Sequence, residues 1–202
     1  MNVKQLLLVM CLLMFFGGTS ARADGLGYNL VDLGYESFND PSSSGITSDH
    51  AYTVDGSYAL TKSFIVGGAY QHETANLPLG DYSANGYSAG VGYRIPLTDR
   101  VDLFPQLSYD SVNASATQAG VNASRTDTGY DLSVELRGLV TDKVELDGGF
   151  DHSSVGSATN NLFVTGLYSF TNNVAVGLSY SDAQSNGSTI TGWAVALRYY
   201  FR

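Results

Sequence analysis

The chain has 202 residues, with 10 Lys and Arg against 19 Asp and Glu, and a formal net charge of −9. Its one Cys, Cys11, and its three Met all lie in the N-terminal apolar region. This acidic balance argues against a nucleic-acid partner, which needs a basic face. A single Cys in that position excludes a disulfide framework, thiol chemistry and a thiolate metal site in the rest of the chain.

Residues 1–23 have the three parts of a secretory signal. Lys4 supplies a positive charge, residues 6–16 form an apolar stretch too short to span a bilayer, and Ala21-Arg22-Ala23 is a small-x-small cleavage site. We therefore expect a signal peptide over 1–23 and one mature domain over 24–202. No later apolar run reaches the roughly 18 residues of a membrane helix, which excludes a helical membrane protein.

The mature part is predicted to form ten β-strands. Each stretch alternates apolar and polar residues, the pattern of a strand with one face in an apolar medium. Short turns that contain Thr follow every second strand, and longer linkers rich in Ser, Asn, Gly and Asp join the other strand ends. The predicted strands are 29–37, 51–60, 63–73, 84–95, 101–111, 127–140, 144–153, 161–170, 174–182 and 190–201. The predicted turns are 60–62, 97–100, 140–143 and 170–173, and the predicted loops are about 38–50, 74–83, 112–126, 154–160 and 183–189.

The aromatic residues indicate which face of these strands meets lipid. Most of the mature Phe, Tyr and Trp residues fall on the apolar face of their strand and near one of its ends. Near the long loops lie Tyr35, Tyr52, Tyr70, Tyr87, Tyr109, Tyr130, Phe150, Tyr180 and Trp193. Near the short turns or the C-terminus lie Tyr58, Phe64, Tyr93, Tyr168, Phe170, Tyr199 and Phe201. Two such belts are typical of a transmembrane barrel. A soluble β-sandwich, the alternative, gives no reason for aromatic residues at both strand ends.

The short Thr turns, the long Ser and Asn loops and the aromatic last strand, residues 192–201, resemble the small outer-membrane β-barrels of the opacity-protein and OmpA-barrel type. The resemblance covers residues 25–202 as a pattern. It implies a Gram-negative outer membrane, with membrane lipid and lipopolysaccharide as partners, and a last strand read by the barrel-assembly machinery. This chain departs from the family pattern because Arg202 follows Phe201. We expect an all-β, transmembrane, antiparallel up-and-down barrel of ten strands, with eight as the alternative.

Charged residues on the polar face are predicted to form a ring inside the periplasmic end of the barrel. Three Arg residues each lie four positions before a Thr turn or the C-terminus, so they should share one height. Acidic residues stand opposite them across the hairpins or across the strands that close the barrel. The predicted pairs are Arg94 with Asp102, Arg137 with Glu145, and Arg198 with Asp32. We expect these pairs to constrict the barrel, since barrels of about eight strands are filled by side chains.

The sequence gives little support for an enzyme. His152 and Ser154 lie on the same face of one strand, an arrangement that resembles the lipid A deacylases of the outer membrane. A hydrolase also needs a carboxylate that orients the imidazole, and the following strand has none while Asp131 and Glu135 face the interior. An outer-membrane protease would need strands that extend well above the membrane, for which we expect this chain to be too short.

No cofactor or metal site is expected. Three scattered His residues and no mature Cys lack the spacing of a zinc site, and the N-terminal Asp residues lack the spacing of a calcium loop. The sequence therefore predicts a non-enzymatic barrel that acts in envelope structure or surface interaction, with loops 38–50 and 112–126 as its most exposed surfaces. A narrow pore for small polar solutes is the alternative, and a lipid A-modifying hydrolase is a remote one. The extracellular partner is unknown.

Overall fold

The computed structural model describes residues 20–21, 26–39, 48–77, 80–118, 121–185 and 187–201. Within these ranges the chain is all β, and no helix is long and apolar enough to cross a membrane. The predicted signal peptide lies almost entirely outside the described residues, as do Arg202 and most of the predicted loop 38–50.

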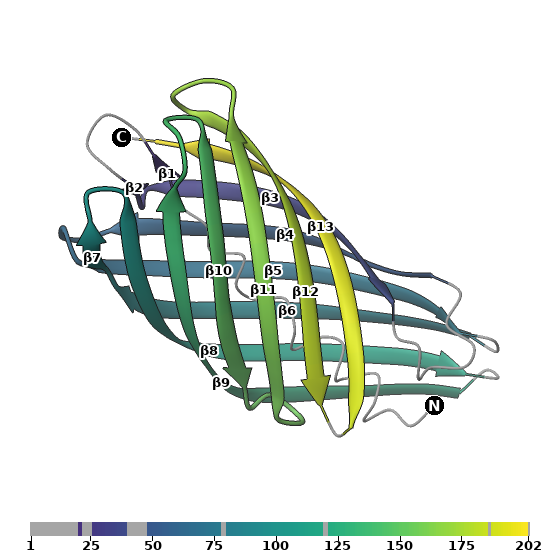
Figure 1. Ribbon diagram of the computed structural model, residues 1–202. Helices are drawn as coiled ribbons and strands as arrows, with labels where there is room; N and C mark the ends of the chain where they lie inside the picture. The colour runs from purple at the N-terminus through teal and green to yellow at the C-terminus, as the bar shows by residue number, and fades with distance from the viewer. Residues whose placement is uncertain are drawn as a thin grey trace.

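Ten long antiparallel strands close into a barrel (Figure 1). Successive strands pair with one another, and the last strand pairs with the first, so the sheet has no open side. The strands are β3 (Leu30–Asn39), β4 (Ser48–Ala59), β5 (Phe64–Leu77), β6 (Gly80–Tyr93), β8 (Val101–Gln118), β9 (Val121–Leu139), β10 (Val144–Ser153), β11 (Thr159–Ser169), β12 (Val174–Ser185) and β13 (Ser188–Tyr200). The prediction of a ten-stranded up-and-down barrel is confirmed, and the alternative of eight strands is wrong.

Three short strands complete the description. β1 (Ser20–Ala21) pairs with β2 (Leu26–Gly27). β7 (Ile95–Thr98) follows β6 after a break at Arg94 and continues the pairing with β8. The break places Arg94 at the junction of the two strands, close to the short-turn end of the barrel.

The Thr residues that recur in the sequence organise the short turns. In the turn after β4, the Thr61 hydroxyl oxygen accepts hydrogen bonds from the backbone N–H groups of Ser63 (3.2 Å) and Phe64 (2.9 Å). Thr141 and Thr171 accept the equivalent pairs of bonds after β9 and β11. The hydroxyl thus satisfies two backbone donors of a tight turn, which explains why the sequence repeats Thr at each of these points.

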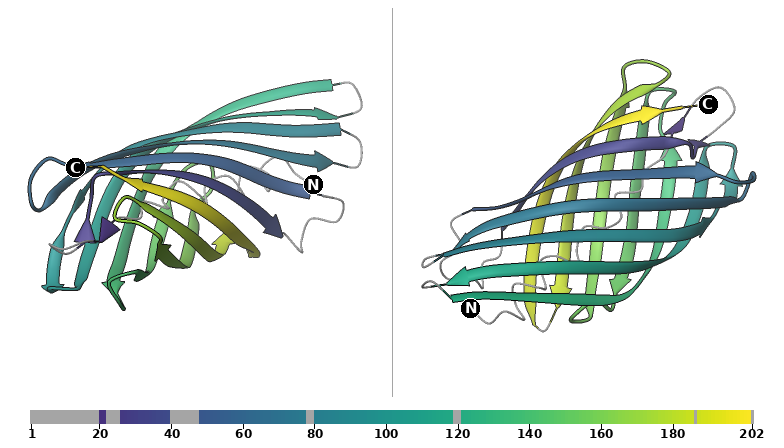
Figure 2. Two further views of the ribbon diagram at one scale, coloured as in Figure 1. Left: turned by 90° about the horizontal axis from the view of Figure 1, so that it is seen from above. Right: turned by 180° about the vertical axis from the view of Figure 1, so that it is seen from behind.

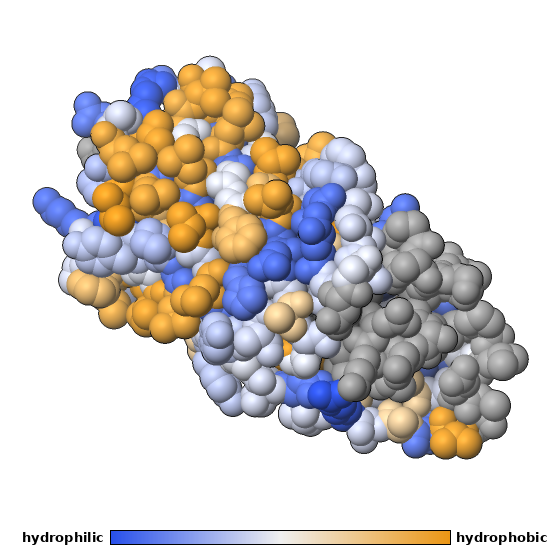
Figure 3. Space-filling view, turned by 60° about the horizontal axis from the view of Figure 1, so that its bottom comes forward, coloured by the Kyte–Doolittle hydropathy of each residue, from blue (hydrophilic) through white to orange (hydrophobic). Residues whose placement is uncertain are grey.

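The two faces of the barrel wall follow the predicted alternation. On β9, Val134 and Leu136 are 46% and 48% exposed, whereas Ser133, the residue before Val134, is only 4% exposed. Nearly all the aromatic residues predicted to face lipid are exposed; Tyr180 and Phe201 are half-buried. In the view of Figure 3, apolar side chains gather toward the short-turn end, and hydrophilic ones predominate toward the other end.

Several strands extend further than the sequence pattern predicts. β5 continues to Leu77, β6 starts at Gly80, β8 runs to Gln118 and β9 starts at Val121. The predictions of loops at 74–83 and 112–126 are therefore wrong, since most of these residues are paired strand (Figure 2). Apolar alternation stops where a sheet leaves lipid, because both of its faces then meet water or polar groups. Ser, Thr and Asn at that level resemble a loop in sequence although they continue the strand.

Candidate functional site

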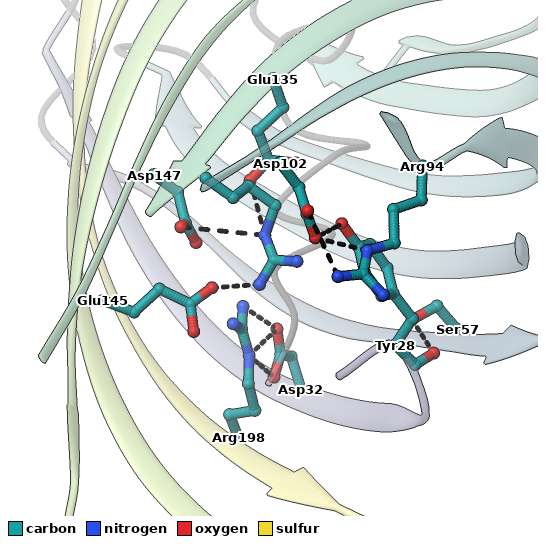
Figure 4. A network of polar contacts seen from close by, with 10 residues as sticks. Tyr28, Asp32, Ser57, Arg94, Asp102, Glu135, Glu145, Asp147 and Arg198 are labelled. Carbon is teal, nitrogen blue, oxygen red and sulfur yellow. Dashed lines mark hydrogen bonds and ion pairs between the residues drawn. The ribbon is translucent and has the colours of Figure 1, made fainter. Parts of the chain in front are cut away.

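The three predicted Arg residues pair with carboxylates inside the barrel near its short-turn end. Figure 4 shows two of them, Arg94 and Arg198, among the acidic residues of the site. Arg94 contacts Asp102 on β8, with 2.6 Å between Nε and Oδ2. The carboxylate of Asp102 is fully buried, while the Arg94 side chain keeps 22% of its surface exposed. This pair spans the junction between β6 and β7 and connects it to the next strand.

Arg198 and Asp32 form the second predicted pair. They are direct partners across β13 and β3, the two strands that close the barrel. The guanidinium contacts both carboxylate oxygens, with Nε 2.8 Å from Oδ1 and Nη2 2.8 Å from Oδ2. A two-point contact of this kind fixes the orientation of both side chains as well as their charge, so the pair determines how the two strands meet.

Arg137 on β9 is the centre of the network. It is completely buried and forms an ion pair with Glu145 on β10. Its Nε atom also lies 3.6 Å from a carboxylate oxygen of Glu135 and 3.8 Å from one of Asp147. Asp147 is the direct partner of Arg137 across β9 and β10, and Glu135 precedes Arg137 by two residues on the same face of β9. We call the three Arg residues with Asp32, Asp102, Glu135, Glu145 and Asp147 the charge network.

Tyr28 joins this network from outside the ten strands, and the sequence analysis missed it. Its hydroxyl donates a hydrogen bond of 2.9 Å to Oδ2 of Asp102. The guanidinium carbons of Arg94 and Arg137 lie 5.5 Å and 4.9 Å from the centre of its ring, within the range of cation–π contacts. Burial raises the pKa of the Tyr28 hydroxyl above its ordinary value. Tyr28 precedes the first strand, so no strand alternation could assign it a direction.

A small apolar cluster holds Tyr28 in place. Its ring packs against Phe104 with 5.1 Å between ring centres, and Leu26 and Ile65 are buried beside them. Phe104 lies over Gly92 of β6, where a Cβ atom would collide with its ring. The backbone before β3 is also anchored, because the Ser57 hydroxyl donates to the carbonyl of Tyr28 (3.0 Å). Residues 26–28 thus bring apolar and aromatic bulk into the same end of the barrel as the charge network.

Acidic groups predominate in the interior. Among the described residues, twelve buried side chains are Asp or Glu, whereas the buried basic side chains are Arg137 and Arg198. Of the carboxylates beyond the charge network, Asp55 lies directly opposite Asp32, and the others lie toward the long-loop end, on β3–β5 and on β8–β10. They include Glu36 and Glu73, which both flank the small side chain of Ala51. The interior is therefore strongly electronegative, which the predicted ring of balanced pairs did not anticipate.

The remaining candidate site residues have structural partners. The Ser154 hydroxyl donates to the carbonyl of Tyr130 (3.1 Å) and accepts from its N–H (2.9 Å), while Nδ1 of His152 lies 2.8 Å from Oδ1 of Asn160. The Ser154 hydroxyl therefore donates to and accepts from the backbone of β9. Within the described ranges, no three His, Cys, Asp or Glu side chains are arranged to hold a metal ion.

A closed antiparallel barrel with an apolar, aromatic-belted exterior and a charged interior defines the class of transmembrane β-barrels. The chain belongs to the outer membrane protein beta-barrel domain family, whose match covers residues 7–201. No curated protein sequence matches the chain.

Solved structures with a similar fold are bacterial barrels. The translocator domain of the autotransporter NalP from Neisseria meningitidis is 12% identical, with 87% of this chain and 89% of that chain covered and a TM-score of 0.54. The NanC porin is 9% identical, with 85% and 100% covered and a TM-score of 0.50. The beta domain of the Bordetella autotransporter BrkA is 12% identical, with 86% and 99% covered and a TM-score of 0.50. At these identities the likeness concerns the fold alone.

Proposed function

We propose that the protein is a non-enzymatic barrel of the Gram-negative outer membrane that acts in envelope structure or surface interaction. The acting surface is the part of β5, β6, β8 and β9 that continues past the belt of Tyr70, Tyr87, Tyr109 and Tyr130, hereafter the outer extension. The observation that carries this proposal is strand length. β8 and β9 have 18 and 19 residues, whereas about 9–11 suffice to cross a bilayer.

The geometry of the hairpin supports a rigid acting surface. Tyr109 and Tyr130 are direct partners across β8 and β9, and regular pairing continues from there to Gln118 and Val121. Residues 111–118 add eight positions, about 26 Å of strand at roughly 3.3 Å per residue. A paired sheet of this length presents fixed side chains to a partner, which a flexible loop does not.

The interior supports a closed barrel over an open one. Three guanidinium groups, their carboxylate partners, Tyr28 and Phe104 occupy one end of the barrel. A ten-stranded barrel leaves little space around such groups, because wide aqueous channels belong to barrels of about 16 strands. The commitment of the Ser154 hydroxyl to Tyr130 supports the absence of a deacylase site.

A shortened hairpin tests the proposed function. Val112 and Asp127 are direct partners, so replacing residues 113–126 with Asn-Gly closes β8 and β9 by a tight turn. The barrel should still insert and keep a gel mobility that changes on boiling. Cells that carry the variant should lose the protein's contribution to exclusion of a hydrophobic dye or to surface attachment. Wild-type behaviour in both assays would contradict the proposal. A two-residue insertion at Gly187, in the short β12–β13 connection, is the matched control.

A narrow pore for small cations is the second candidate. It is favoured by the excess of interior carboxylates over guanidinium groups, which would attract cations and repel anions. Single-channel recording on the refolded protein distinguishes the two candidates. A steady, cation-selective conductance in the wild type would favour the pore, and silent membranes would favour the closed barrel.

A further inference from the structure

The outward face of the outer extension is a regular array of small polar side chains. It is formed by the outward-facing residues of 72–76, 81–85, 111–117 and 122–128, hereafter the polar lattice. The register places these side chains in rows that cross four strands. In one row, His72, Asn85, Asn113 and Thr126 are successive direct partners. Neighbouring strands lie about 4.8 Å apart, so the row is a continuous polar strip.

The next row outward has the same character. Thr74, Ser83, Ser115 and Ser124 are successive direct partners on β5, β6, β8 and β9. The hydroxyls of Ser83 and Ser115 lie 3.0 Å apart. Of the inward side chains between these rows, Glu73, Ala84 and Ala114 are buried, whereas Arg125 on β9 is exposed. The lattice is therefore one face of the sheet.

Hydrogen bonds within the lattice orient its amides. The Oδ1 atom of Asn85 accepts from the hydroxyl of Tyr70 (2.8 Å), and Oδ1 of Asn113 accepts from that of Thr126 (2.7 Å). Oδ1 of Asn122 accepts from the hydroxyl of Thr117 (2.8 Å). Because the carbonyl oxygen is used within the sheet in each case, the Nδ2 group is the part of the amide that can donate to a ligand. The Thr hydroxyls that donate keep their oxygen lone pairs as acceptors.

Charge and polarity narrow the class of ligand. Among the outward-facing residues of the lattice, Asp81 is the one Asp or Glu, and none is Lys or Arg. The nearby exposed Arg125 is paired with Asp127, with 2.5 Å between Nη2 and Oδ1. A phosphate, a sulfated glycan or a nucleic acid would therefore find no uncompensated cation on this face, and an apolar partner would find no large aliphatic side chain. Pre-oriented amide donors and hydroxyl acceptors at short, regular spacing match the hydroxyl groups of uncharged sugars. Holding them in place before binding lowers the entropy cost of that contact.

The position of the lattice indicates the source of the sugar. Its first row follows directly after Tyr70 and Tyr87, direct partners whose rings lie 5.3 Å apart and which belong to the outer aromatic belt. Aromatic belts mark the membrane interface. The lattice thus rises from that interface and faces sideways, toward whatever stands beside the barrel in the outer leaflet. The glycolipid of that leaflet carries its sugar chain at this height.

We propose that the polar lattice binds the uncharged sugar chain of the lipopolysaccharide molecules that surround the barrel. This inference rests on the proposed function, because it names the partner of the outer extension. The contact would couple the protein laterally to its own membrane. If this face bound a soluble ligand, a host surface or a second copy of the chain instead, the proposal would be wrong.

The first experiment measures sugar binding directly. The folded protein in nanodiscs is titrated with uncharged polysaccharide released from smooth lipopolysaccharide, and binding is followed by saturation-transfer NMR. Replacing two adjacent amides, in the double variant Asn85→Leu/Asn113→Leu, should weaken binding by about tenfold, the loss expected for a few hydrogen bonds. The control Asn160→Leu removes an exposed Asn on β11, outside the lattice. Its Oδ1 lies 2.8 Å from Nδ1 of His152, just as Oδ1 of Asn85 lies 3.0 Å from Nδ1 of His72. This control should bind as the wild type does, and heparin should not bind to any of the three.

Three results of this titration would overturn the proposal: no saturable binding by the wild type, equal affinity in the lattice double variant, or a preference for heparin. A change in oligomeric state of the double variant without a change in sugar binding would also overturn it, in favour of a second copy as occupant. None of these results bears on the dye and attachment assays of the shortened hairpin. Failure of the sugar proposal is therefore distinguishable from failure of the proposed function.

A second experiment identifies the occupant in the membrane. A photo-crosslinking amino acid, p-benzoylphenylalanine, replaces Ser115 in one variant and Asn160 in another. In cells with long sugar chains, irradiation should attach lipopolysaccharide at position 115 and much less at position 160. In cells whose lipopolysaccharide lacks the outer sugars, the product at 115 should disappear. A product at 115 that contains a polypeptide, or one that persists in the truncated cells, would overturn the proposal.

Discussion

Arg198 and Asp32 lie directly opposite each other where the last strand of the barrel pairs with the first. Although they are far apart in the chain, the guanidinium contacts both carboxylate oxygens at 2.8 Å. Both side chains are almost completely buried. Closure of the barrel and formation of this ion pair are therefore one event, since neither group finds its partner until β13 and β3 meet.

Removing one partner of this pair should destabilise the barrel strongly. Asp32→Ala leaves the Arg198 charge buried, and such a change costs about 3–5 kcal/mol in other buried pairs. Urea unfolding of the refolded protein in lipid measures the effect. Arg100→Ala is the control, because Arg100 and Asp142 form an ion pair at the surface with side chains 54% and 88% exposed. We expect no measurable change there, and equal losses in the two variants would refute a closing role for Arg198 and Asp32.

Truncating Tyr28 should open the constricted end. Tyr28→Ala removes the ring that lies beside Phe104, Arg94 and Arg137 and leaves a gap between the charge network and the apolar cluster. Single-channel recordings should show larger or more frequent openings than in the wild type. Tyr28→Phe keeps the ring and should leave the conductance unchanged. If Tyr28→Ala also leaves it unchanged, residues 26–28 do not obstruct the lumen.

The same residue predicts an alkaline limit to stability. Burial raises the folded-state pKa of the Tyr28 hydroxyl above the ordinary value of 10.0, so folding favours the neutral form. Its contribution is complete below pH 10 and is lost as the pH rises through the folded-state pKa, because the unfolded chain then releases a proton that the folded chain retains. The free energy of unfolding should fall less steeply above pH 10 in Tyr28→Phe. Parallel pH profiles for the two proteins would argue against this role.

The parts of the fold that sequence reasoning recovers are those set by two local rules. Alternation with a period of two assigns each side chain to lipid or to the interior, and the Thr turns fix the height of the strands. Together these rules predicted that Arg94 would meet Asp102 and that Arg137 would meet Glu145. The structure brings both pairs together. Whether the charge network closes or braces the barrel stays a prediction.

The features that the sequence did not reveal lie where these rules do not apply. Tyr28 precedes the first strand, so it has no register, and its partners Phe104 and Asp102 come from a distant strand. The outer extension lies above the membrane, where strands lose the apolar alternation that identifies them. Its outer row, such as Ser83 beside Ser115, depends on a pairing between two segments that the sequence reads as separate loops, 74–83 and 112–126.

The assignment of lipid-facing and inward-facing side chains on β9 can be tested with two substitutions, one on each face of the strand. Leu136→Arg places a cation on the lipid face, where Leu136 is 48% exposed, at a cost of about 2–4 kcal/mol near mid-bilayer. Ser133→Arg places the same side chain inside, next to its direct partner Asp151 and near Asp131, which offer carboxylates to the new charge. The fraction of protein in outer-membrane extracts whose gel mobility changes on boiling measures folding. It should drop in Leu136→Arg and remain close to wild type in Ser133→Arg. Equal damage from both substitutions would mean that the assignment of faces along β9 is wrong, since a shift of one residue exchanges lipid and interior for every side chain on the strand.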